Sequence, residues 1–119
     1  YKNYVSIDGG MTDSPRYALY KADYTCLLAN KMDEANDFKA SVVGRLCESG
    51  DIIQEDVMLP ASVGRYDTLA LCTAGAYHYS MASHYNRLPK PPVIMLKGGT
   101  ESYVAVKGET FEDVIRNDM

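Results

Sequence analysis

A cysteine stands directly beside a carboxylate in this sequence, at Cys47 and Glu48, and a Ser-Gly-Asp turn follows at once. The apolar and β-branched residues 40–46 predict a buried strand that delivers the pair to a loop, where chemistry is often found. Because the neighbouring negative charge disfavours the thiolate, we expect a protonated thiol, a poor nucleophile but a usable proton donor. The alternative is a buried structural cysteine beside a solvated glutamate.

A second pair of polar side chains is predicted to share one face of a short helix. Ser14 and Pro15 are typical of a helix start, with Ser14 as the cap, and the helix would run over residues 15–20. Arg16 and Tyr20 are four residues apart, so their side chains lie on the same side. A guanidinium and a phenol there can bind a carboxylate or a phosphate. The alternative is a surface arginine beside a half-buried tyrosine.

Residues 76–86 form the densest polar and aromatic stretch, which holds three of the ten tyrosines and directly follows Gly75. A tyrosine joins a large apolar body to a hydroxyl that needs a partner when buried. The stretch is therefore predicted to be either a ligand-binding wall or a subunit contact. His78 and His84 are six residues apart and share no helix face, so we expect no metal pair and two partly exposed histidines.

Length and composition favour one globular domain. The chain has 119 residues, of which 46% are hydrophobic and 24% charged, with a net charge of −4. No basic cluster suggests nucleic acid or an anionic membrane, and no apolar run is long enough to span a bilayer. The three cysteines are widely spaced without a Cys-x-x-Cys pair, so zinc is not expected. An odd cysteine count without a signal peptide predicts a cytoplasmic location.

The pattern of short apolar runs predicts a mainly β fold with two or three short helices. Residues 30–37 would connect two strands as a hairpin, Gly98 and Gly99 mark a second hairpin, and a capping box at Thr110 opens a terminal helix. Without long helical crossovers, an antiparallel β-barrel or sandwich with Greek-key-like connections is expected. The predicted strands are 4–8, 24–29, 39–47, 52–59, 67–73, 93–97 and 102–107.

Three strings carry a family resemblance: DGGMTDSPRYALY at 8–20, CESGD at 47–51 and GAYHYSMASHYN at 75–86. Together they resemble the C-terminal β-domain of the meso-diaminopimelate decarboxylases, alanine-racemase-like enzymes of fold type III that use pyridoxal 5'-phosphate in lysine biosynthesis. The resemblance implies that residues 1–119 are one C-terminal domain. An N-terminal α/β barrel, outside this sequence, would hold the cofactor on a Schiff-base lysine. A homodimer with shared active sites is also implied.

The resemblance also implies a role for five residues. Arg16 and Tyr20 would bind the substrate carboxylate. Cys47 would protonate the substrate after carbon dioxide leaves, acting across the dimer, and Glu48 would contact the distal end of the substrate in the partner's site. Tyr77 would lie at the cofactor phosphate and near the substrate.

Three positions depart from the family pattern. Tyr17 stands where the family usually has proline, His78 where it has glycine, and His84 where it has asparagine. We expect Tyr17 and His78 to alter loop packing and substrate access more than the class of reaction. Cys26 and Cys72 receive no role beyond filling space.

The implied reaction is decarboxylation of meso-2,6-diaminopimelate to L-lysine and carbon dioxide. A related decarboxylase of lysine or ornithine is the first alternative, because those substrates also end in an ammonium group that Glu48 can pair with. A non-catalytic binding homologue is the second. Under each of these interpretations, the isolated domain without its barrel is expected to be inactive. The chain begins within a predicted strand, so we expect it to be a piece of a longer protein.

Overall fold

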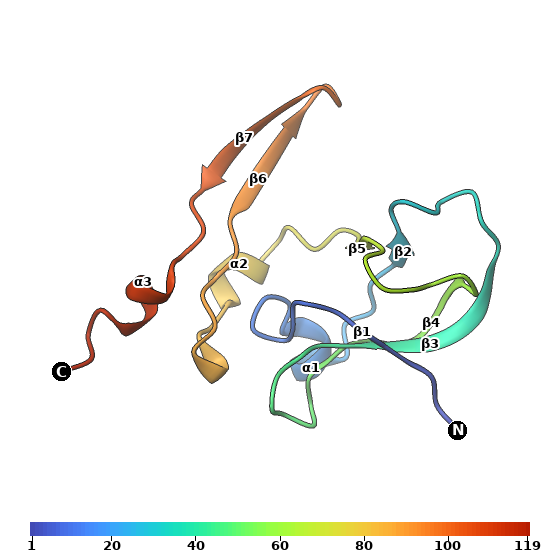
Figure 1. Ribbon diagram of the computed structural model, residues 1–119, viewed down its shortest axis with the longest axis horizontal. Coiled ribbons are helices and arrows are strands. Elements are labelled where there is room, and N and C mark those ends of the chain that lie inside the picture. The colour runs from blue at the N-terminus through green and yellow to red at the C-terminus, as the bar shows by residue number, and fades with distance from the viewer.

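Short strands and shorter helices make up the computed structural model, which describes residues 1–119 (Figure 1). Strands dominate, as the short apolar runs predict. The elements in chain order are β1 (Tyr4–Ser6), α1 (Arg16–Tyr20), β2 (Cys26–Leu28), β3 (Asn36–Val43), β4 (Ile52–Pro60), β5 (Leu69–Leu71), α2 (His78–Met81), the 3-10 helix η1 (Tyr85–Arg87), β6 (Val93–Lys97), β7 (Glu101–Val106) and α3 (Phe111–Ile115).

The largest sheet has the strand order β1-β3-β4. β3 and β4 pair antiparallel, with Ala40 opposite Val57, as expected for consecutive strands. β1 instead pairs parallel to β3, with Tyr4 opposite Ser41, so the expectation of a wholly antiparallel fold is wrong here. The physical reason is the long connection between them: α1 and β2 lie on it, which leaves enough chain for the crossover that a parallel pair requires.

β2 is not part of this sheet and pairs antiparallel with β5. The prediction of a hairpin over residues 30–37 is therefore wrong. Polar side chains of that segment hold the start of β5 instead. Asn30 Nδ2 donates to Asp67 Oδ1 at 2.8 Å, and Lys31 Nζ donates to Asp67 Oδ2 at 2.7 Å. Side chains of this acidic and polar segment therefore bind next to β5, which is distant in the sequence, and the segment does not form a hairpin between β2 and β3.

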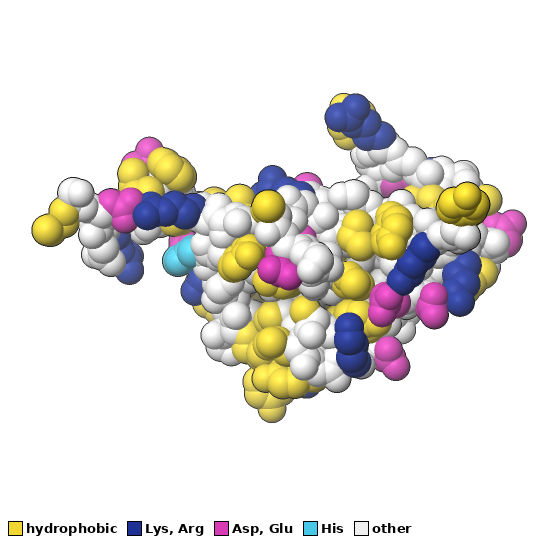
Figure 2. Space-filling view, turned by 90° about the horizontal axis from the view of Figure 1, so that it is seen from below, with side chains coloured by type: hydrophobic (Ala, Val, Ile, Leu, Met, Phe, Trp, Pro, Cys, Tyr) yellow, Lys and Arg dark blue, Asp and Glu magenta, His cyan; other side chains and the backbone are white.

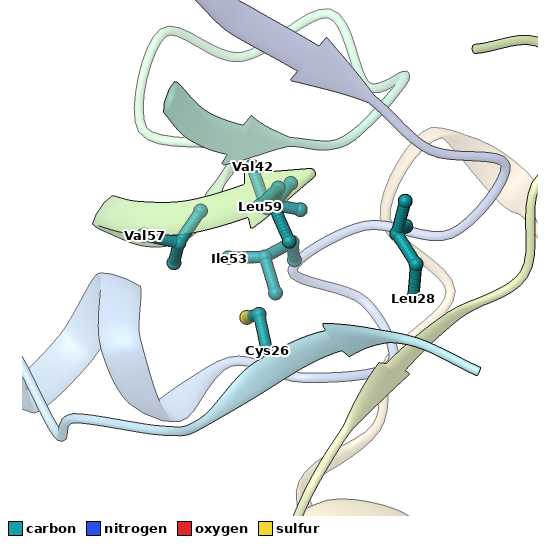
Figure 3. Close-up of a cluster of buried hydrophobic side chains, with 6 residues drawn as sticks. All are labelled: Cys26, Leu28, Val42, Ile53, Val57 and Leu59. Carbon is teal, nitrogen blue, oxygen red and sulfur yellow. The ribbon is translucent and has the colours of Figure 1, made fainter. Parts of the chain in front are cut away.

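The hydrophobic core lies between β2 and the β3–β4 pair (Figure 3). Alternate residues of a strand point to the same face, which places Ile53, Val57 and Leu59 of β4 together against β2. Burial raises the pKa of the Cys26 thiol to about 11, so this cysteine stays protonated and packs as a small apolar side chain. The six buried members of the core are Cys26, Leu28, Val42, Ile53, Val57 and Leu59.

β6 and β7 form a separate hairpin that projects from the rest of the chain (Figure 1). The predicted turn is confirmed: Gly98 has a φ of 60° and Gly99 a φ of 74°, values that glycine adopts without a steric penalty. The capping box at Thr110 that begins α3 is also confirmed. The strands are distributed over three sheets. The mainly β class with short helices is thus confirmed, whereas a closed barrel is not.

The surface is mixed in character. On the face shown in Figure 2, hydrophobic side chains lie exposed beside charged ones, and the Lys and Arg side chains are scattered. Among the helices of this structure, none combines the length and apolar character that a bilayer crossing requires.

Candidate functional site

The CESGD loop (residues 47–51) presents Cys47 to solvent. β3 ends at Val43, earlier than the strand predicted through residue 47, so both Cys47 and Glu48 lie in the loop. The backbone N–H of Cys47 donates to Asn86 Oδ1 at 2.9 Å, which fixes the loop against the tyrosine-rich segment (residues 75–86) and its η1 turn. The alternative of a buried structural cysteine is excluded by this exposure.

Two donors hold the Glu48 carboxylate, one from its own loop and one from η1. The N–H of Gly50 donates to Glu48 Oε1 at 2.9 Å, and the Tyr85 hydroxyl donates to Glu48 Oε2 at 3.3 Å. These donors, first Gly50 and then Tyr85, lower the pKa of the Glu48 carboxyl below its ordinary value. The carboxylate is exposed and ionised at neutral pH, which suits it to pair with a cationic group of a ligand.

Asp51 ties this loop to the first motif, and the sequence reasoning missed it. Its side chain is buried, with 4% of the residue exposed. The N–H of Met11 donates to Oδ1 at 2.7 Å and the N–H of Leu46 to Oδ2 at 2.8 Å. A Cβ built on Gly44 would lie 2.1 Å from Asp51 Oδ2, and one on Gly10 would lie 3.0 Å from Oδ1. Glycines at 10 and 44 were the signal that another group approaches closely here.

Helix α1 begins without the predicted cap. Pro15 is the N-cap residue and no side chain caps the helix, while the Ser14 hydroxyl bonds to His78 instead. Tyr17 is buried, and its hydroxyl donates to Glu55 Oε2 of β4 at 2.6 Å. Burial, together with this bond, raises the pKa of Tyr17 to about 12. Tyr17 therefore seats α1 on β4, and the effect of this departure on loop packing and substrate access stays a prediction.

Arg16 and Tyr77, two of the predicted site residues, lie against each other. The Arg16 Cζ atom is 5.2 Å from the centre of the Tyr77 ring, within the range of a cation–π contact. Arg16 Nη1 also donates to the Tyr24 hydroxyl at 3.1 Å. Tyr20 ends the same helix and is 64% exposed. A cavity of about 400 Å³ opens beside Arg16; its lining is Arg16, Ala22, Asp23, Tyr24, Thr25, Cys72 and Thr73.

One of the two histidines differs from the prediction. His78 is only 7% exposed, so the expectation of partial exposure is wrong. It is buried because both ring nitrogens find partners inside the protein: Nδ1 is 3.1 Å from Ala76 O and Nε2 is 3.0 Å from Ser14 Oγ. The side chain of His84 is 40% exposed, as expected, and pairs with Glu109.

The predicted residues thus form two groups that the tyrosine-rich segment connects. The first contains Arg16 and Tyr77, and the second contains Cys47 and Glu48, beside Tyr85 and Asn86. No hydrogen bond or ion pair joins Cys47 or Glu48 to Arg16. No three His, Cys, Asp or Glu side chains are arranged to hold a metal ion. The half-buried guanidinium of Arg16 and the exposed phenol of Tyr77 are hydrogen-bond donors of the kind that bind anions.

Comparison with known proteins gives a consistent family. Residues 1–75 match the family model described as the pyridoxal-dependent decarboxylase, C-terminal sheet domain. Diaminopimelate decarboxylase from Staphylococcus aureus is 53% identical over 97% of this chain and 27% of its own length. The enzyme of that name from Bacillus subtilis is 46% identical over 99% of this chain and 26% of its own.

A solved structure has the same fold. Diaminopimelate decarboxylase from Helicobacter pylori, complexed with L-lysine, superposes with a TM-score of 0.86 at 35% identity, over 97% of this chain and 28% of that one. The chain therefore spans about a quarter of the length of the curated relatives it matches. The match of the family model to more than half of the residues shows that this chain belongs to the pyridoxal-dependent decarboxylases, as a C-terminal sheet domain.

Proposed function

We propose that residues 1–119 are the C-terminal β-domain of a diaminopimelate decarboxylase, which converts meso-2,6-diaminopimelate to L-lysine and carbon dioxide. Relatives of that name match the chain almost from end to end, and one solved relative is complexed with L-lysine. The structural observation that carries the proposal is the display of Cys47 and Glu48 outward from a loop that Asn86 and Asp51 hold in place. A thiol presented in this way can reach a ligand that the chain itself does not enclose.

Pyridoxal 5'-phosphate fits the donors of the first group. Tyr77 is 66% exposed and the half-buried Arg16 covers one face of its ring, so a phenol and a guanidinium lie side by side. Tyr77 would donate its hydroxyl proton to an oxygen of the cofactor phosphate. When bound, the cofactor supplies the electron sink for the electron pair left by decarboxylation. Its Schiff-base lysine belongs to the barrel domain, outside this chain.

The chain's own residues then bind the substrate and supply a proton. Arg16 would pair with a substrate carboxylate through its guanidinium, with the Tyr20 hydroxyl as a second donor on the same helix. Glu48, ionised by its loop donors, would accept from the distal ammonium group. The bond between the α-carbon and the carboxylate breaks, carbon dioxide leaves, and the S–H proton of Cys47 replaces it on that carbon.

A homodimer with shared sites and an N-terminal barrel on the same chain are part of the proposal. Cys47 and Glu48 are exposed on their loop, so both side chains are free to reach the active site of a partner subunit. The β6–β7 hairpin supports the missing domain, because Ile94, Leu96 and Val104 are exposed on a hairpin with no other strand beside it. Closure of the sheets into a barrel, and a cytoplasmic location, stay predictions for the full-length protein.

The direct test is turnover by the full-length protein with pyridoxal phosphate on meso-diaminopimelate, lysine and ornithine. We expect carbon dioxide release from diaminopimelate in preference to the other two. Preference for lysine or ornithine would contradict the substrate, and no release from any would favour a non-catalytic homologue.

The proton-donor role has its own variant. Cys47→Ala should lower kcat by about two to four orders of magnitude, the usual contribution of a general acid, without loss of folded protein because the side chain is exposed. Cys26→Ala, which removes a buried core thiol, is the matched control and should retain kcat per folded enzyme. Equal kcat in Cys47→Ala and wild type would refute the assignment.

A further inference from the structure

His78, the first residue of α2, contacts the residues before α1 through one ring nitrogen and its own backbone segment through the other. The Nδ1 atom lies 3.1 Å from the carbonyl oxygen of Ala76, and Nε2 lies 3.0 Å from the hydroxyl of Ser14. Because a carbonyl oxygen only accepts, Nδ1 carries a proton and donates to Ala76 O, while Nε2 exchanges a hydrogen bond with the Ser14 hydroxyl. His78 is 7% exposed, so neither nitrogen is left to contact a ligand.

A continuous set of contacts leads from His78 to the Arg16 guanidinium. The Tyr24 ring meets the His78 ring edge-on, with centroids 5.2 Å apart and an interplanar angle of 81°. The hydroxyl of Tyr24 accepts from Arg16 Nη1 at 3.1 Å. On the other side, Tyr77 precedes His78 with a φ of 71° and places its ring 5.2 Å from Arg16 Cζ.

Both neighbours that fix the Arg16 guanidinium therefore depend on His78. Tyr24 packs on its ring, and Tyr77 is covalently attached to it in a backbone conformation that tyrosine rarely adopts. An arginine side chain loses much rotamer freedom when it binds. A guanidinium already held at the edge of a cavity has lost that freedom before the ligand arrives, which favours binding.

We propose that His78 is a positioning residue for substrate binding, which sets the Arg16 guanidinium toward the substrate carboxylate through Tyr24 and Tyr77. This inference rests on the proposed function, because it takes Arg16 as the group that binds the carboxylate. His78 itself touches neither the substrate nor the cofactor. Its effect falls on the affinity for ligands that carry a carboxylate, and the proton transfer at Cys47 lies in the other group of residues.

The test uses full-length protein loaded with cofactor and compares His78→Ala with wild type. Three quantities are measured: KM for meso-diaminopimelate, kcat, and the dissociation constant of L-lysine. We expect KM and the lysine dissociation constant to rise about tenfold, which corresponds to about 1.4 kcal/mol, with kcat changed less than about threefold. The matched control is His84→Ala on the same segment, where the partner is Glu109 and KM should not change.

A second variant and a rescue separate positioning from folding. Ser14→Ala keeps the imidazole and removes only the hydrogen-bond partner of Nε2, and it should raise KM in the same direction by a smaller factor. Free imidazole should restore the KM of His78→Ala by filling the vacated space. Unchanged KM in both variants, or a fall in kcat alone, overturns the inference while the proposed function stands. Wild-type protein that neither binds lysine nor turns over diaminopimelate overturns both.

Discussion

Gly44→Ala is the sharpest perturbation of the candidate site, because it adds one methyl group against a buried carboxylate. A Cβ at this position would lie 2.1 Å from Asp51 Oδ2 and 2.5 Å from both Cγ and Oδ1. Ordinary van der Waals contacts begin about 1.3 Å farther out, so the carboxylate must move away. Asp51 is buried and cannot simply turn into solvent.

The cost follows from the two hydrogen bonds that this movement breaks. Asp51 accepts from Met11 N at 2.7 Å and from Leu46 N at 2.8 Å. A hydrogen bond to a charged group contributes about 1.5–3 kcal/mol. Loss of both therefore destabilises the junction of the two loops by about 3–6 kcal/mol, provided that the two bonds contribute independently.

Hydrogen–deuterium exchange of the full-length protein, read by mass spectrometry, measures this local opening. At about 1.4 kcal/mol for each factor of ten, the amides of Met11 and Leu46 should exchange about two to four orders of magnitude faster in Gly44→Ala. Gly75→Ala is the matched control, since its Cβ would have no atom within 4 Å. Wild-type exchange in Gly44→Ala, or equal acceleration in Gly75→Ala, would show that the Asp51 contacts do not hold the loops together.

Two further predictions concern the helices on either side of the site. Tyr17 has its pKa raised from 10.0 to about 12, so the stability from its protonated hydroxyl should be fully present below about pH 10 and lost as the pH rises through 12. Tyr17→Phe should flatten this alkaline decline in urea unfolding midpoints; an unchanged slope would refute the link to Glu55. Thr110→Ala removes the acceptor for Asp113 N and should destabilise α3 by about 1 kcal/mol, seen as faster amide exchange there. Thr100→Ala, in the exposed hairpin turn, should leave α3 unaffected, and equal effects would argue against the cap.

Local patterns predicted the elements whose stabilising contacts are close in sequence. The Gly98–Gly99 hairpin and the Thr110 cap depend on backbone conformation and on bonds between residues a few positions apart. Short apolar and β-branched runs predicted β3 and β4, which pair as neighbours along the chain. Strand pairing between distant segments was not predictable in this way. Both the parallel β1–β3 pair and the β2–β5 pair are chosen by core packing and by side chains such as Asp67.

The same distinction applies to the candidate site. Residue type and motif were enough to propose Arg16, Cys47, Glu48 and Tyr77 as candidates, since a thiol, a carboxylate or a guanidinium has its chemistry wherever it lies. The sequence could not show that a buried Asp51 bonds to two distant backbone amides.

The burial of His78 is the clearest feature that only the tertiary structure determines. From the sequence, this residue was expected to be a partly exposed histidine, and no local pattern pointed to Ser14 as the partner of its Nε2. The fold brings Ser14 to that nitrogen across 64 residues and closes the space around the ring. Burial and hydrogen bonding depend on which segments meet, and only the folded chain decides that.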